Sequence, residues 1–131
     1  MLFRSLVGKD HPSLVPSLGN LANLYAMQDR PVDAQKLLER SLALEEKAFG
    51  TETGYLVTTL NNLALAHLAQ KHYPAATAAW ERVLKIQETE NGPYHASLLP
   101  TLNALYDVYD KQGNKVEAAK AGRRIEAVSE M

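Results

Sequence analysis

Two stretches of the chain decide its fold, because each is a version of the other. Residues 17–40 read SLGNLANLYAMQDRPVDAQKLLER, and residues 59–82 read TLNNLALAHLAQKHYPAATAAWER. Over the full period of 42, residues 11–52 align without a gap on residues 53–94, and 13 pairs are identical, where about three are expected by chance. A third, shorter copy starts at His95 and keeps Leu102, Leu105, Gln112 and Ala118. The chain is therefore a repeat protein.

Each copy has the spacing of two amphipathic helices, because its apolar residues recur at intervals of three and four. No run alternates with a period of two, so we expect an all-α chain. Pro16 and Pro100 occupy one repeat position near the start of a first helix; either the helix begins later or its first turn lacks a hydrogen bond. Gly50 and Gly92 follow the second helices, as expected of residues that end a helix. The predicted helices span residues 12–28, 31–49, 52–70, 73–90, 94–112 and 115–130.

The period also divides the chain. We expect one domain of three repeats, at residues 11–52, 53–94 and 95–131. Residues 2–8 align with residues 44–50, so residues 1–10 are interpreted as the tail of a preceding helix or as an N-terminal cap. Short turns make each helix pair antiparallel, and one pair cannot bury both of its apolar faces. Neighbouring pairs must therefore stack on each other.

Composition excludes several classes of function. Among the 131 residues, 14 basic side chains balance 15 acidic ones, which gives no electrostatic case for nucleic acid as a partner. No cysteine is present, which excludes disulfides, thiol nucleophiles and cysteine-ligated metals. No apolar run approaches the roughly 20 residues that span a bilayer, and the N-terminus does not fit a signal peptide. We expect a cytoplasmic protein that has no membrane partner.

The pattern His-Pro-x-x-x-x-x-Leu-x-Asn-Leu-Ala-x-Leu-Tyr, from His11 to Tyr25, resembles a tetratricopeptide repeat of the 42-residue kinesin light chain type. The resemblance covers nearly the whole chain. It implies a right-handed superhelix, or α-solenoid, of three antiparallel helix hairpins, whose first helices line a concave groove. The third copy departs from the pattern, because Tyr106 replaces a small residue and Gly122 a large one. This exchange is either a compensating swap or a sign of looser packing.

The first helices carry polar residues at positions that face away from the predicted core. An amide side chain both donates and accepts, so a ladder of amides can bind an extended peptide backbone whatever its side chains are. The alternative is that these asparagines bond to a neighbouring helix and fix the pitch of the superhelix. The predicted groove residues are Asn20, Asn23, Asn61, Asn62, Asn103, Asp107, Asp110 and Lys111.

Nothing in the sequence suggests catalysis. The motifs of phosphate loops, nucleophile elbows and zinc helices are missing. His11 and His95 precede first helices, where the resemblance implies capping, and His67 replaces a tyrosine of the pattern, which favours packing. Trp80 occupies the position of Leu38 and is expected in the core. We therefore expect no enzyme activity, no metal site and no cofactor.

The sequence favours a non-catalytic scaffold for protein–protein interaction that binds a peptide or helix of a partner in its concave groove. Asp107 and Asp110 suggest a basic or hydroxyl-bearing residue at that end of the ligand. The alternative is a structural segment that stacks on other repeats or forms homo-oligomers, with the groove unused. Exposed repeat ends would be the surface of such self-association.

Overall fold

The computed structural model describes residues 11–130, in which six α-helices and three short 3-10 helices form without any strand. The predicted role of residues 1–10 lies outside the described residues. The α-helices are α2 (Val15–Met27), α3 (Pro31–Phe49), α4 (Val57–Ala69), α5 (Tyr73–Asn91), α6 (Leu99–Gln112) and α7 (Lys115–Ser129). The 3-10 helices η1 (Pro12–Leu14), η2 (Gly54–Leu56) and η3 (Ala96–Leu98) precede α2, α4 and α6.

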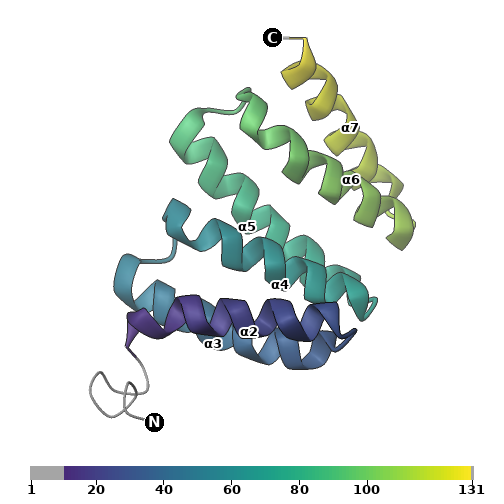
Figure 1. Ribbon diagram of the computed structural model, residues 1–131. Helices are drawn as coiled ribbons and strands as arrows, with labels where there is room; N and C mark the ends of the chain where they lie inside the picture. Colours follow the sequence, from purple (N-terminus) through teal and green to yellow (C-terminus); the bar gives the residue numbers. More distant parts are fainter. Residues whose placement is uncertain (1–10, 131) are drawn as a thin grey trace.

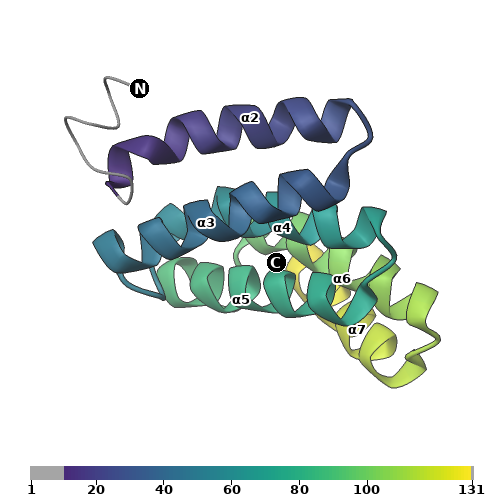
Figure 2. The ribbon, with the colours of Figure 1, turned by 90° about the horizontal axis from the view of Figure 1, so that it is seen from below.

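Consecutive helices pair as three hairpins, α2 with α3, α4 with α5 and α6 with α7. The hairpins stack in chain order, because α4 also packs on α3 and α6 also packs on α5 (Figure 1). Seen from below, α2 lies at the edge of the stack (Figure 2). This arrangement confirms the predicted all-α solenoid of antiparallel hairpins.

The first helices begin later than predicted. Residues 12, 52 and 94 were expected to start them, but the α-helices begin at Val15, Val57 and Leu99. Pro16 and Pro100 then fall in the first turn, where a missing N–H leaves no bond unmade. Of the two alternatives for these prolines, a later helix start and a first turn that lacks a hydrogen bond, the later start is correct. Each 3-10 helix begins with a side-chain cap: backbone N–H groups donate to His11 Nδ1, Thr53 Oγ1 and His95 Nδ1.

The second helices α3 and α5 end at the predicted glycines, and the first helices are also followed by residues with positive φ. Gly50 and Gly92 have φ of 91° and 88° at the ends of α3 and α5. Asp29, Lys71 and Gly113, at one repeat position after the first helices, also have positive φ, of 59°, 61° and 74°. Two of the three copies thus hold a non-glycine residue in the left-handed region, which is strained relative to glycine.

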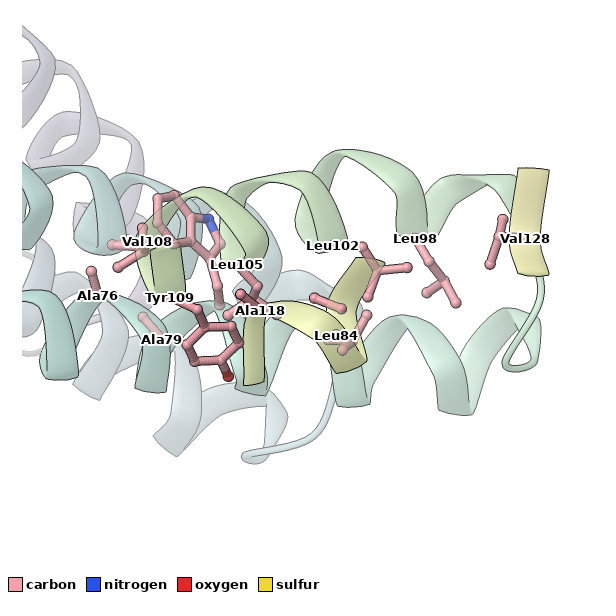
Figure 3. Packing of buried hydrophobic residues seen from close by; sticks show 13 residues of the cluster. Ala76, Ala79, Leu84, Leu98, Leu102, Leu105, Val108, Tyr109, Ala118 and Val128 are labelled. Atoms are coloured by element: carbon pink, nitrogen blue, oxygen red, sulfur yellow. The ribbon is translucent and has the colours of Figure 1, made fainter. Parts of the chain in front are cut away.

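The core lies between the layers of helices and follows the repeat. Leu56 and Leu98 occupy one repeat position and Leu60 and Leu102 another, and all four are at most 1% exposed. The largest cluster joins α4 to α7, and Figure 3 shows Leu102 and Leu105 of α6 lying between residues of α5 and α7. Trp80 is 5% exposed within this cluster, as its repeat position predicts.

The exchange in the third copy is compensated. A Cβ atom placed on Gly122 would lie 3.6 Å from Cε2 of Tyr106, so the tyrosine ring covers the space left by the glycine. Tyr106 is 41% exposed, whereas Trp80, at the equivalent interface of the second hairpin, is 5% exposed. The third hairpin is therefore closed by a different pair of side chains.

Polar contacts between hairpins also recur with the period. Arg82 Nη2 lies 3.0 Å from Glu46 Oε2, and Arg124 Nη1 lies 2.9 Å from Glu88 Oε1. Deeper in the same interfaces, the Thr101 hydroxyl donates to Gln87 Oε1 at 2.9 Å. The equivalent Thr59 hydroxyl donates to a carboxylate, that of Glu45, which is 6% exposed. Burial raises the pKa of Glu45, and the hydrogen bond from Thr59 partly offsets this.

We expect Glu45→Gln to stabilise the fold at pH 7 by about 1–2 kcal/mol, because a glutamine accepts the Thr59 bond without a buried charge. Glu45 has a raised pKa when folded, so it favours folding below its ordinary pKa of 4.5 and disfavours it as pH rises through the raised value. The gain should therefore vanish below about pH 4.5. Urea unfolding at pH 4 and pH 7 measures both values. A variant that is equally stabilised at both pH values would contradict this explanation.

Candidate functional site

A hollow of about 170 Å³ lies between α2 and α4, on the face of the first helices. Ala34 and Leu38 of α3 also line it. Most of its wall is apolar, and two amides and one carboxylate are its polar groups. The remaining lining residues are Ala22, Asn23, Ala26, Asp29, Pro31, Asn62, Leu65, Ala66 and Ala69.

Small residues create this hollow. Ala26, Pro31 and Leu38 line it, whereas the residues 42 positions later are Leu68, Tyr73 and Trp80. These three larger side chains pack in the core cluster that joins α4 to α7. The first and second hairpins therefore leave space where the second and third hairpins are filled.

Two predicted groove residues meet at this hollow. Asn23 comes from α2 and Asn62 from α4, and both line it. Asn20 occupies in α2 the repeat position of Asn62 and is exposed. Leu65 also lines the hollow and is 54% exposed, and it was not among the predicted groove residues. Comparing side-chain sizes between copies could have indicated this place, because Ala26, Pro31 and Leu38 are smaller than their counterparts Leu68, Tyr73 and Trp80.

Asn61 contacts its own hairpin. Its Oδ1 accepts a hydrogen bond from Trp80 Nε1 at 3.0 Å, which satisfies the one donor of a buried indole. The amide thus orients the tryptophan in the core. This contact is of the kind that the helix-bonding alternative predicts.

The four predicted residues of α6 are all exposed and, with spacings of four, three and one positions, share one side of the helix. Asp107 and Lys111 occupy the repeat positions of Leu65 and Ala69, so they continue the face of the hollow. Asn103 occupies the repeat position of Asn61, which bonds to Trp80 of its own hairpin. Asp110 occupies the position of Leu68, which packs against the cluster that joins α4 to α7. Asn103 and Asp110 therefore lie at the flank of the face that Asp107 and Lys111 continue.

A larger depression of about 390 Å³ lies among α5, α6 and α7, and two others, of about 350 and 540 Å³, lie on the second helices. The larger of these two holds Lys120, Arg123 and Arg124, but Arg124 pairs with Glu88 and Lys120 pairs with Glu117 at 3.2 Å. The smaller of the two holds the equivalent Arg82–Glu46 pair. Both are open, charged surfaces in which Arg82, Lys120 and Arg124 already have acidic partners.

His67 is a packing group in the structure. Its Nδ1 is buried without a hydrogen-bond partner, and burial is the main cause of its lowered pKa. Its ring centroid lies 6.2 Å from that of His72. Across residues 11–130, no group of three or more histidine, cysteine or acidic side chains is placed to hold a metal ion. Over the same residues, no helix is long and apolar enough to cross a membrane.

Helical hairpins that stack in chain order define the class of α-helical repeat proteins. The chain belongs to the tetratricopeptide repeat family: one family model for this repeat matches residues 55–131 and a second matches residues 17–53. Repeats of this family typically form scaffolds for protein–protein interaction and not enzymes.

Solved structures agree with this assignment. The nearly identical TPR-like repeats of a Podosopora anserina protein described as a kinesin light chain superpose with a TM-score of 0.74 at 27% identity, over 90% of this chain and 56% of that one. BtubC (BKLC) from P. vanneervenii superposes with a TM-score of 0.81 at 23% identity, over 97% of this chain and 51% of that one. The chain thus spans about half the length of these relatives. No curated protein sequence matches it.

Proposed function

We propose that the chain is an interaction module that holds an extended segment of a partner protein along the face of α2, α4 and α6. One aliphatic side chain of the segment enters the hollow between α2 and α4, and its backbone bonds to Asn23 and Asn62. The observation that carries this proposal is the position of both amides around a single apolar hollow.

The apolar wall favours an aliphatic anchor. A cavity of about 150 Å³ in another protein accommodates a benzene molecule, so a hollow of about 170 Å³ has room for a side chain such as leucine or methionine. Burying such a side chain contributes about 1.5–3 kcal/mol. Leu65, which is half exposed, would lose its contact with water in the same step.

The amides favour an extended backbone. Each offers two N–H donors and one carbonyl acceptor, which matches the alternating N–H and C=O groups of a peptide. No hydrogen bond within residues 11–130 is assigned to the side chain of Asn23 or Asn62, in contrast to Asn61. Each amide–backbone bond would contribute about 1 kcal/mol.

The charged residues set the orientation of the ligand. Asp29 lies at the hollow, and Asp107 and Lys111 lie farther along the same face on α6. A segment with a basic or hydroxyl-bearing residue beyond its aliphatic anchor would pair with Asp107. Asn20 would extend the contact along α2, and Asn103 and Asp110 would contribute only at the flank.

A library of random linear peptides displayed on phage, selected against the whole chain, tests this proposal. We expect the selected peptides to share an aliphatic position. A selected peptide, measured by fluorescence anisotropy, should bind at least about tenfold more weakly to Leu65→Asp, and about fivefold more weakly to Asn23→Ala or Asn62→Ala.

Asn91→Ala is the matched control, because Asn91 is an exposed amide at the end of α5 that bonds to Ser97 and lies away from the hollow. Its affinity should equal that of the unchanged chain. Peptides that bind all four variants equally would overturn the groove as the binding site. The same result is expected from the alternative in which the repeats only stack on one another.

A further inference from the structure

The two depressions on the second helices occupy equivalent places in the repeat, but their charges differ. The first, of about 350 Å³, is lined by residues of α3, α5 and the loop that follows α3. Its two acidic and two basic side chains form two ion pairs. Arg82 lies 3.0 Å from Glu46, and Lys85 lies 3.8 Å from Glu52. The charges of this α3–α5 depression are therefore balanced.

The second depression, of about 540 Å³, is lined by residues of α5, α7 and the loop that follows α5. It keeps one of the two ion pairs, since Arg124 lies 2.9 Å from Glu88. The other pair has no counterpart, because the residues 42 positions later are Tyr94 and Ala127. The α5–α7 depression has thus lost one acidic and one basic group together.

Two further basic side chains line the α5–α7 depression. They are Lys120 and Arg123, at the repeat positions of Ala78 and Glu81. Three basic groups therefore stand against the single carboxylate of Glu88. This local excess occurs in a chain whose formal net charge is -1.

Arg123 is the basic group of this surface that is available to a ligand. It is exposed, and its side chain forms no ion pair or hydrogen bond with any of residues 11–130. Lys120 and Arg124 pair with Glu117 and Glu88, but these pairs lie at the surface. Surface ion pairs are weak, so Lys120 and Arg124 can exchange their partners for a ligand carboxylate.

The openness of this surface does not depend on where α7 stands in the stack. The repeat position of Arg123 is taken by Glu39 in α3 and by Glu81 in α5, and both are exposed although a further hairpin packs on each of these helices. The position of Lys120 is exposed in all three hairpins. A hairpin that packs on a second helix therefore leaves these two positions in contact with solvent.

We propose that the α5–α7 depression binds an acidic segment of a partner protein. One carboxylate pairs with Arg123, whose planar guanidinium can hold both oxygens of a carboxylate. A second carboxylate shares Arg124 or Lys120 with its present partner. Tyr94, which is 54% exposed, gives an apolar wall for the methylene groups of a glutamate. Three basic groups on one open surface thus match a run of acidic residues.

This surface is separate from the hollow of the proposed function. The hollow is lined by α2, α3 and α4, whereas the α5–α7 depression shares none of its residues. The two sites can therefore be occupied independently. Failure of one proposal leaves the other unaffected.

Fluorescence anisotropy of a fluorescein-labelled hexaglutamate peptide, titrated with the whole chain, tests the proposal. We expect a dissociation constant on the order of 100 µM at low salt. The affinity should fall about tenfold between about 20 mM and about 200 mM NaCl, because salt screens exposed charges. Arg123→Glu should weaken binding at least about tenfold and leave the far-UV circular dichroism spectrum unchanged, since Arg123 has no partner to lose within residues 11–130.

Three further variants act as controls. Lys36→Glu makes the same change of charge on an exposed residue of α3 that lines neither depression, so it should bind hexaglutamate like the unchanged chain. Tyr94→Glu restores the acidic residue of the α3–α5 depression and should weaken binding about threefold or more. Asn62→Ala alters the hollow and should have no effect on this peptide.

Three results would overturn the proposal. Hexaglutamate that fails to bind the unchanged chain at about 1 mM in low salt would show that the depression does not attract carboxylates. Equal weakening by Arg123→Glu and Lys36→Glu would show that only the net charge of the chain matters. A phosphoserine peptide or a DNA duplex that binds at least about tenfold more tightly than hexaglutamate would assign the surface to phosphate groups.

Discussion

Replacing Trp80 with alanine is expected to lower the free energy of unfolding by about 3–5 kcal/mol, the range for a large aromatic side chain removed from a core. Trp80 is 5% exposed in the cluster that joins α4 to α7. The substitution also removes the donor that satisfies Asn61. Because stacked hairpins share this cluster, the loss should affect the packing of both α4 and α6.

Urea unfolding followed by circular dichroism measures this loss, since the variant contains no other tryptophan to report fluorescence. Tyr55→Ala is the control: Tyr55 is 68% exposed and only stacks on Phe49, so its loss should cost about 1 kcal/mol or less. A loss below 1 kcal/mol for Trp80→Ala would mean that the second hairpin does not depend on the indole.

Replacing Gly122 with leucine is expected to lower the free energy of unfolding by about 1–3 kcal/mol, the usual range for an overfilled core. The Tyr106 ring already occupies the space beside this glycine. Adding Tyr106→Ala should restore most of the loss, because the double variant recreates the Ala22 and Leu38 pair of the first hairpin. The coupling energy between the two substitutions should therefore be positive and above 1 kcal/mol.

Gly122→Ala is the matched control. Its Cβ would meet the tyrosine ring at an ordinary contact distance of 3.6 Å, and alanine favours a helix over glycine by about 0.5–1 kcal/mol. This variant should be slightly more stable than the unchanged chain. Additive effects of Gly122→Leu and Tyr106→Ala would show that the two side chains do not compensate each other.

Much of the fold could be predicted from the sequence because the apolar positions of the core recur in three copies of the repeat. The second helix at residues 31–49 was predicted correctly, since Pro31 and Gly50 fix its ends. The first helices were predicted to begin too early, because a 3-10 turn and an α-helix place apolar residues at similar spacing. The left-handed Asp29 and Lys71 were missed, since only Gly113 at that position indicates the conformation.

The candidate site was predictable in part. Asn23 and Asn62 were predicted as groove residues because they face away from the predicted core, and both line the hollow, although their binding role remains a proposal. The hollow itself depends on three-dimensional packing, in which Leu68, Tyr73 and Trp80 fill one interface and smaller residues leave the other open. The contact of Asn61 depends on the indole of Trp80, which only one copy contains.

Nuclear magnetic resonance of the ¹⁵N-labelled chain, titrated with a peptide selected as above, tests the central claim most directly. We predict that the side-chain amide signals of Asn23 and Asn62 and the backbone signals of Leu65 and Ala66 shift and saturate together. The Asn61 side-chain signal, held by Trp80, should change less. Shifts confined to α3, α5 and α7, with the hollow unaffected, would contradict a binding groove on the first helices.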